Sequence, residues 1–90
     1  PVIAMCIAPM VVAKVLGRYE VELTLGPDDN QASGVAKGFG CRVRACGPTD
    51  VCVDTEHKVI TTPAYMVASR ISEIFAGAEN MVAELENILQ

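Results

Sequence analysis

The chain has 90 residues, a net charge of −4 at pH 7, 51% hydrophobic residues and only 4% aromatic residues. Ninety residues form at most one small domain, which can hardly bury so large an apolar fraction, so we expect a partner or a further segment to cover part of it. The negative charge and the scarcity of aromatic side chains argue against nucleic acid or an anionic membrane as a partner. No apolar run reaches the roughly 18 residues of a membrane span, and the pattern of a targeting segment is absent.

The four cysteines are Cys6, Cys41, Cys46 and Cys52; no two of them form a C-x-x-C pair, and His57 is the only histidine. We therefore expect no metal site and no cofactor. A disulfide scaffold is not expected either, because the helix and strand patterns need no covalent staples. Free thiols imply a reducing compartment.

The N-terminal stretch 1–10 predicts a buried strand, a sharp turn that carries Cys6, and a helix that starts near Pro9. A thiol at a helix N-terminus meets free amides and a partial positive charge, which favour the thiolate. Cys6 is thus a candidate nucleophile in an elbow between strand and helix. The glycine-rich consensus of hydrolase elbows is absent, and a small buried hydrophobe is the alternative interpretation of Cys6.

The next two elements are predicted from hydrophobic periodicity. Residues 10–16 are apolar on nearly every side, which predicts a buried helix, and Gly17 suits the position that ends it. Residues 19–25 alternate between apolar and polar side chains. This pattern predicts a strand with one solvent-exposed face.

A capped helix and a short strand follow. Asp29 or Asn30 can cap a helix over residues 31–39, which Gly40 ends. The alternation over residues 41–45 then predicts a short strand. Strand and helix thus keep alternating through the first half of the chain.

Residues 47–50 predict a turn, and the two runs 51–53 and 58–62 predict a β-hairpin. His57 falls in the loop of this hairpin. A solvated loop residue is the expected state of His57, in preference to a catalytic base or a metal ligand.

Thr62-Pro63 marks a second junction from strand to helix, because proline again suits the first helical turn. The following apolar positions predict a helix that ends near Gly77 and then a second, amphipathic helix. The apolar positions of the two helices are Val67, Ile71, Ile74 and Phe75, and then Met81, Val82, Leu85, Ile88 and Leu89. The apolar side of the second helix is expected to pack in the core.

The predicted order is β-α-β-α-β-ββ-α-α, which favours an α/β fold with a largely parallel sheet and helices on both faces. The turns at Cys6 and Pro63 would then both lie at carboxyl ends of strands. Open α/β sheets place their ligand crevice at this edge. We therefore expect the two turns to lie close together.

Two blocks, 4–9 (AMCIAP) and 54–66 (DTEHKVITTPAYM), resemble the ElbB-like branch of the ThiJ/PfpI superfamily, a class I glutamine amidotransferase-like group. The resemblance implies a flavodoxin-like sandwich, of which residues 1–90 form the C-terminal half together with a β-hairpin. An N-terminal half outside this chain would cover the excess apolar surface. The chain would then be a proteolytic fragment, a split gene product or part of a longer protein.

The resemblance implies that Cys6 is the catalytic thiol and that Ile7, Thr61, Thr62 and Pro63 line the substrate site, although a purely structural role of the Thr-Thr-Pro turn is the alternative. Relatives with glyoxalase or deglycase activity attack methylglyoxal-like aldehydes with this cysteine, without glutathione. A glutamate from the N-terminal half usually accompanies the cysteine. Protease and glutaminase activities are not expected, because Ile7 stands where protease-like relatives have a histidine.

The alternative function is non-catalytic, as an interaction or structural subunit or as a redox sensor that acts through Cys6. The expected partners are the N-terminal half of the same domain, on the same or a separate polypeptide, a second copy in a homodimer, and a small aldehyde. The mitochondrial matrix or the cytoplasm is the expected location, because the family includes mitochondrial members and the thiols are free.

Overall fold

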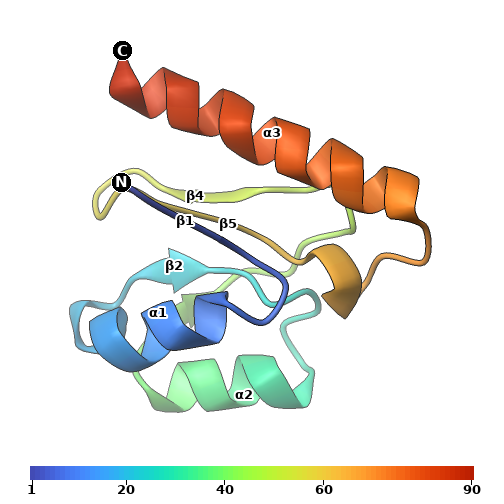
Figure 1. Cartoon of the computed structure of the whole chain (residues 1–90). Coiled ribbons are helices and arrows are strands. Elements are labelled where there is room, and N and C mark those ends of the chain that lie inside the picture. The colour runs from blue at the N-terminus through green and yellow to red at the C-terminus, as the bar shows by residue number, and fades with distance from the viewer.

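Two small sheets form the centre of the computed structural model, which describes all residues from 1 to 90 (Figure 1). The strands are β1 (Val2–Met5), β2 (Glu22–Leu23), β3 (Arg42–Val43), β4 (Cys52–Asp54) and β5 (Val59–Thr62). One sheet has the order β1-β5-β4 and the other pairs β2 with β3. β1 runs parallel to β5 and β2 parallel to β3, while β4 and β5 form the antiparallel hairpin that the sequence predicts.

Helices cover both faces of the strands, as predicted. α1 (Pro9–Leu16) and α2 (Gln31–Gly38) lie on one face, and α3 (Ile71–Leu89) lies on the other (Figure 1). Two short 3₁₀ turns, Gly17–Tyr19 and Ala64–Met66, follow α1 and β5. The structure is therefore a layered α/β arrangement with a mostly parallel set of strands.

The segment around β2 lies at the centre of the core, which corrects the prediction of a strand with one wet face. Val21, Leu23 and Leu25 are fully buried, and so is Thr24, whose side chain was expected to face solvent. The reason is that α1 and α2 cover one side of β2 while β4 and β5 lie along the other. The backbone amide of Thr24 donates to Thr61 Oγ1 at 3.0 Å, which joins the two sheets.

The N-terminal elements are less buried than predicted. β1 is not a buried strand, because Val2 and Ile3 are 42% and 39% exposed, and α1 exposes Val11 and Val15. β1 has a neighbour on one side only, so half of its surroundings are open. Gly17 continues into the 3₁₀ turn with φ −58° instead of ending α1 in the left-handed region.

Gly17 has a packing role instead. A Cβ atom at this position would lie 2.3 Å from the carbonyl oxygen of Phe39, so only glycine lets the two backbone segments approach. At the other end of the core, the predicted cap and stop of α2 are confirmed. Asn30 Oδ1 accepts a hydrogen bond from the Ser33 amide at 2.8 Å, and Gly40 turns the chain at φ +103°.

The C-terminal region is one helix and not two. α3 runs unbroken from Ile71 to Leu89, and Pro63 starts only the 3₁₀ turn. Gly77 lies within the helix, where it lets α3 approach the strands closely. A Cβ there would lie 3.1 Å from Thr62 Oγ1 and 3.2 Å from the Pro48 carbonyl oxygen. The predicted core stripe is also only partly buried, with Met81 inside and Val82 and Leu89 exposed.

Candidate active site around Cys6

Cys6 lies directly after β1, in a turn between this strand and α1. Its backbone has φ 62°, a left-handed conformation that a residue with a Cβ rarely adopts. The Cys6 amide donates to the Thr62 carbonyl at 3.0 Å, so the turn is fixed to the end of β5. The side chain is half-buried. This is a strand–turn–helix elbow that presents a thiol at the carboxyl edge of the sheet.

The neighbouring strand ends in a second strained turn. Met5 lies opposite Thr62 in the parallel register, so the turns at Cys6 and Pro63 are adjacent, as predicted. Ala64, the residue after Pro63, also has a positive φ of 47°. Non-glycine residues in this conformation collect at functional sites because the surrounding structure must hold them there.

The amides near Cys6 are mostly engaged. Those of Ala8, Met10 and Val11 donate to the carbonyls of Met5, Ile7 and Ala8 respectively, and Pro9 has no N–H to offer. The Ile7 N–H donates to no group of the chain, and Ile7 itself is 54% exposed. In elbow enzymes the N–H after the nucleophile stabilises the developing oxyanion. The Ile7 amide is thus the one N–H of this turn that is free for a ligand.

Thr61, Thr62 and Pro63 are fully buried. Thr61 Oγ1 accepts the Thr24 amide, and Thr62 Oγ1 donates to the Asp50 carbonyl at 2.7 Å. Both hydroxyls therefore have structural partners: Thr61 binds the core segment around β2, and Thr62 binds the turn before β4.

His57 lies at the opposite end of the sheet from Cys6. It occupies the hairpin turn before β5, whereas Cys6 is level with the end of β5, and the two strands run parallel. His57 is also not a free loop residue: its Nδ1 lies 2.9 Å from Asp54 Oδ2, and its amide donates to Asp54 Oδ1 at 2.9 Å. The chain therefore provides no histidine base for Cys6.

Asp54 was not singled out from the sequence. Burial of Asp54 raises its pKa, but hydrogen bonds from the Glu22 amide, from the His57 amide and from the His57 ring outweigh this and hold the pKa below its usual range. The spacing D-x-x-H across a hairpin turn is the signal that could have indicated this pair. The carboxylate ties the hairpin to β2.

The other three thiols differ from Cys6 in their surroundings. Burial raises the pKa of Cys41, Cys46 and Cys52, in the case of Cys52 to about 12. All four cysteines are free, and no group of three or more histidine, cysteine or acidic side chains is placed to hold a metal ion. Because the thiolate is the nucleophile, the raised pKa values make Cys41, Cys46 and Cys52 poor nucleophiles.

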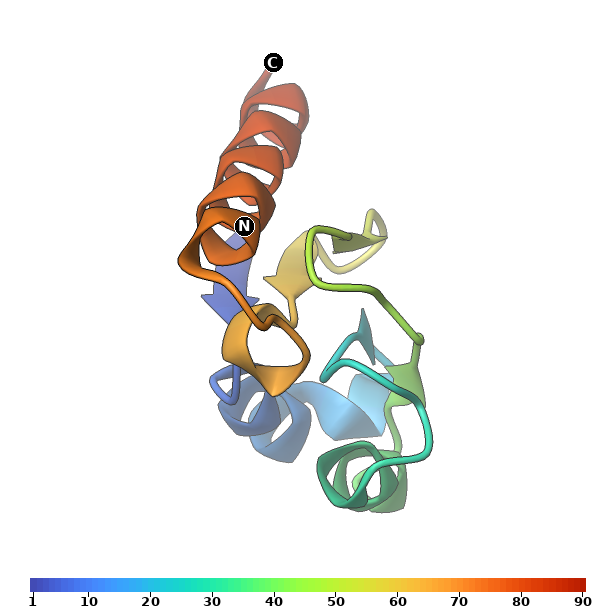
Figure 2. The same ribbon diagram turned by 90° about the vertical axis from the view of Figure 1, so that its right-hand side faces the viewer.

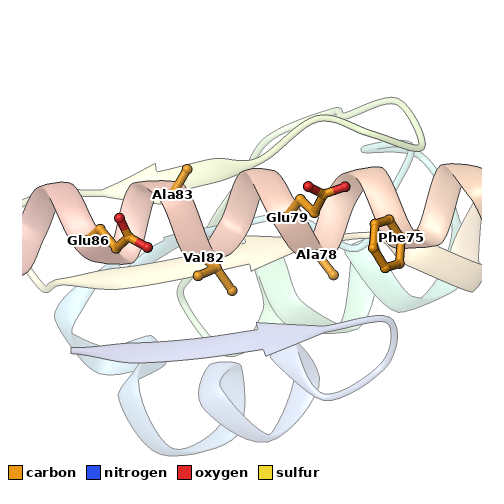
Figure 3. Close-up of a pocket in the computed structure, with 6 residues that line it drawn as sticks. All are labelled: Phe75, Ala78, Glu79, Val82, Ala83 and Glu86. Carbon is orange, nitrogen blue, oxygen red and sulfur yellow. The ribbon is translucent and has the colours of Figure 1, made fainter.

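No cavity of this chain is lined by Cys6 or by Ile7, Thr61, Thr62 or Pro63. The largest cavity, about 410 Å³, is a groove along α3 on the other side of the strands from α1 (Figure 3). These 90 residues form the turn at Cys6 and the strained turn at Ala64, but they form no enclosed substrate crevice around Cys6.

No helix has the combination of length and apolar character that crossing a membrane requires.

Comparison with solved structures identifies the class of protein. A crystal structure of an isoprenoid biosynthesis protein with an amidotransferase-like domain, from Ehrlichia chaffeensis, matches the whole chain with a TM-score of 0.90 and 26% sequence identity. The chain covers 41% of that protein. The fold is therefore amidotransferase-like, with the flavodoxin-like arrangement that the sequence predicts.

Comparison with curated proteins agrees. The chain is 33% identical over 93 residues to the mitochondrial ES1 protein homolog of Rattus norvegicus, a match that includes 94% of this chain and 34% of the relative. No family model matches the chain. The resemblance to the ElbB-like branch of the ThiJ/PfpI superfamily that the sequence predicts is confirmed, and the chain spans about a third of the length of this curated relative.

Proposed function

We propose that this chain is the cysteine-bearing part of an ElbB-like enzyme that converts methylglyoxal-like aldehydes to hydroxy acids without glutathione. The observation that carries the proposal is the elbow: Cys6 stands half-buried at φ 62°, fixed to β5, with the free Ile7 N–H beside it. Deglycase activity on aldehyde adducts uses the same attack.

The reaction begins when the Cys6 thiolate adds to the aldehyde carbon of methylglyoxal. A C–S bond forms, the carbonyl electrons move to oxygen, and the Ile7 N–H stabilises this oxyanion until a proton neutralises it. A base then moves the proton of the former aldehyde carbon to the neighbouring ketone carbon, and the hydroxyl proton passes to the ketone oxygen. The ketone thereby becomes an alcohol, and the former aldehyde carbon becomes the carbonyl of a thioester with Cys6. Water cleaves the resulting thioester to lactate and frees Cys6. One carbon is oxidised and its neighbour reduced, so no external oxidant is needed.

His57, the one histidine of this chain, lies at the far end of β5 from Cys6 and does not supply the base. We propose that a segment corresponding to the other half of the domain supplies it, on the same or a separate polypeptide, and that this segment also forms the walls of the crevice. The whole protein can form a homodimer. We place it in a reducing compartment, the mitochondrial matrix or the cytoplasm; the relative from Rattus norvegicus is described as mitochondrial.

The test is lactate formation from methylglyoxal by the chain assembled with the rest of its domain. Cys6→Ala should abolish turnover, whereas Cys46→Ala, which removes another half-buried thiol, should leave it within about twofold of the parent. Turnover that survives Cys6→Ala, or its absence from the parent assembly, would contradict the proposed reaction.

The alternative is a sensor in which peroxide oxidises Cys6 to the sulfenic acid, with water as the other product and a thiol as the reductant that restores it. The position of His57 at the far end of the sheet from Cys6 favours this reading for the 90-residue chain by itself. Dilute hydrogen peroxide followed by peptide mass spectrometry tests it. Oxidation that dithiothreitol reverses should occur at Cys6 and not at Cys41 or Cys52, whose pKa values burial raises.

A further inference from the structure

Thr62 is the last residue of β5, and hydrogen bonds hold it on two sides. Its backbone carbonyl accepts the Cys6 amide at 3.0 Å, and its hydroxyl donates to the Asp50 carbonyl at 2.7 Å. Its side chain is fully buried, so water does not replace a lost partner. In Figure 2, which shows this end of the sheet from outside, the 3₁₀ turn after β5 lies between the start of α3 and the turn that carries Cys6. Thr62 therefore connects the Cys6 turn to the turn that precedes β4.

The partner of the Thr62 hydroxyl is itself held in place. Asp50 closes the turn before β4 twice: its Oδ2 accepts the Gly47 amide at 2.8 Å, and its own amide donates to the Gly47 carbonyl at 3.2 Å. α3 holds the same turn, because Asn80 Nδ2 donates to the Thr49 carbonyl at 3.0 Å. The Asp50 carbonyl is thus a fixed point to which the end of β5 is attached.

α3 also limits the space around the Thr62 hydroxyl. The backbone of Gly77 approaches so closely that a Cβ there would lie 3.1 Å from Thr62 Oγ1. Contacts of this length are tighter than most that a Cβ makes, so an added methyl group would press on the hydroxyl. Contacts from α3 and from the turn before β4 together fix where the hydroxyl lies.

The Cys6 turn depends on the other bond of Thr62. Cys6 has a φ of 62°, which is unfavourable for a residue with a Cβ and persists only where the surroundings hold it. The Cys6 amide is held by the Thr62 carbonyl, whereas the next amide, that of Ile7, donates to no group of the chain. A shift of residue 62 would therefore change the directions of the Cys6 thiol and of the Ile7 N–H together.

We propose that Thr62 is a positioning residue: the Asp50 carbonyl and α3 fix its hydroxyl, its carbonyl fixes the Cys6 amide, and the thiol and the Ile7 N–H are thereby aimed at the aldehyde. In this role Thr62 acts through Cys6 and not by contact with the substrate, because its hydroxyl is already engaged. The effect on turnover rests on the proposed aldehyde chemistry. The effect on the Cys6 turn does not.

Three variants of the chain assembled with the rest of its domain test this role. Thr62→Val removes the hydroxyl and keeps the shape of the side chain, whereas Thr62→Ser keeps the hydroxyl. Ser33→Ala is the matched control: Ser33 is also fully buried, and its hydroxyl donates to the Pro27 carbonyl at 2.6 Å, but it lies on α2 and has no bond to the Cys6 turn. Both Thr62→Val and Ser33→Ala leave a backbone carbonyl without its partner, so both should lower stability.

Amide exchange measured by NMR reports on the turn directly. Ala4 is the internal reference, because its amide faces β5 like that of Cys6, two residues along the parallel ladder. Thr62→Val should raise the exchange rate of the Cys6 amide relative to that of Ala4 by about fivefold or more. Thr62→Ser and Ser33→Ala should keep this ratio within about twofold of the parent, because a general loss of stability raises both rates together.

Turnover gives the second readout. Thr62→Val should lower kcat about tenfold or more and leave KM within about twofold, because misplaced reacting groups raise the barrier after the substrate has bound. Thr62→Ser should restore most of kcat, and Ser33→Ala should keep both constants near those of the parent.

Gly77→Ala approaches the same contact from α3. It should lower kcat about threefold or more by displacing the Thr62 hydroxyl, although alanine adds helix propensity, so the loss would not come from unfolding. Gly34→Ala, which meets nothing within 4 Å, is its control and should keep the parent kcat.

The outcomes separate the positioning role from the enzyme itself. An unchanged ratio of Cys6 to Ala4 exchange in Thr62→Val, or equal losses of kcat in Thr62→Val and Ser33→Ala, would overturn the positioning role and leave the enzyme standing. A parent assembly that forms no lactate would remove the proposed enzyme. The exchange ratio would then still decide whether Thr62 holds the Cys6 turn.

Discussion

β1 is apolar throughout and the segment around β2 alternates between apolar and polar residues, yet the β2 segment is the more deeply buried of the two. Val21, Leu23 and Leu25 are fully buried, whereas Val2 and Ile3 are about 40% exposed. The β2 segment has helices on one side and the hairpin strands on the other, while β1 has β5 as its single neighbour. Burial thus follows from the place of a strand in the fold and not from its hydrophobicity alone.

The largest difference between the two regions should appear when a core side chain is shortened. Leu23→Ala should lower the free energy of unfolding by about 3–5 kcal/mol or leave the chain unfolded, because it opens a cavity among fully buried side chains. Val11→Ala, on the exposed side of α1, should change it by no more than about 0.5 kcal/mol. Urea unfolding followed by circular dichroism measures both, and similar losses would erase the contrast.

Two glycines give a sharper comparison of close packing with open surface. Gly17→Ala should cost about 1–3 kcal/mol, because the new methyl group would meet the Phe39 carbonyl. Gly34→Ala, in α2, meets nothing within 4 Å and should gain about 0.5–1 kcal/mol through helix propensity. Melting temperatures of the two variants should move in opposite directions. A stabilising Gly17→Ala would show that the α1–α2 contact is loose.

Acid should lower the free energy of unfolding through protonation of Asp54, which joins the hairpin to β2. Its pKa is lower in the folded chain than in the unfolded chain, so its contribution is complete above the unfolded value of about 4 and is lost as the pH falls through the lower folded value. Asp54→Asn should cost about 1–3 kcal/mol at pH 7, because the carboxylate accepts three hydrogen bonds. Unfolding curves from pH 7 to 2 should be flatter for the variant. Glu79→Gln, on exposed α3, is the control and should keep the parent profile.

The smallest expected effect concerns the strained turn at the open edge. Cys6→Gly should be more stable than Cys6→Ala by about 0.5–1 kcal/mol, since alanine keeps a Cβ in the left-handed region and glycine does not. Ala4→Gly, at an ordinary strand position, should instead lose stability. Thermal melts of the three variants check this order. Equal stability of Cys6→Gly and Cys6→Ala would mean that the turn relaxes in solution.

The sequence predicted the local elements that local chemistry controls. Pro9 at the first turn of α1, Asn30 as the cap of α2 and the hairpin around residues 54–58 are all confirmed. The elbow at Cys6 and its closeness to Thr62 also followed from the sequence, because the carboxyl ends of parallel strands meet at one edge. The first turn, the cap and the hairpin depend on backbone preferences within a few residues, whereas the closeness of Cys6 and Thr62 depends on the general arrangement of parallel strands.

The wrong predictions all concern what lies across space. Gly77 was expected to end a helix, but it lies against Thr62 and Pro48, fifteen or more residues away along the chain. Thr24 was expected to face solvent, yet it lies between two sheets. The missed Asp54–His57 pair is different, because its D-x-x-H spacing is local to the hairpin turn and could have indicated it.

By itself the sequence determined the alternation of strands and helices, the thiol at the end of the first strand and the resemblance to the family. Periodicity and turn chemistry are local properties, and the two family blocks are contiguous. Only the tertiary structure decided that β1 is an open edge, that α3 is one helix with an apolar flank, and that His57 stands at the far end of the sheet from Cys6. Strand order and the direction of a helix flank depend on contacts between distant residues, which no local pattern encodes.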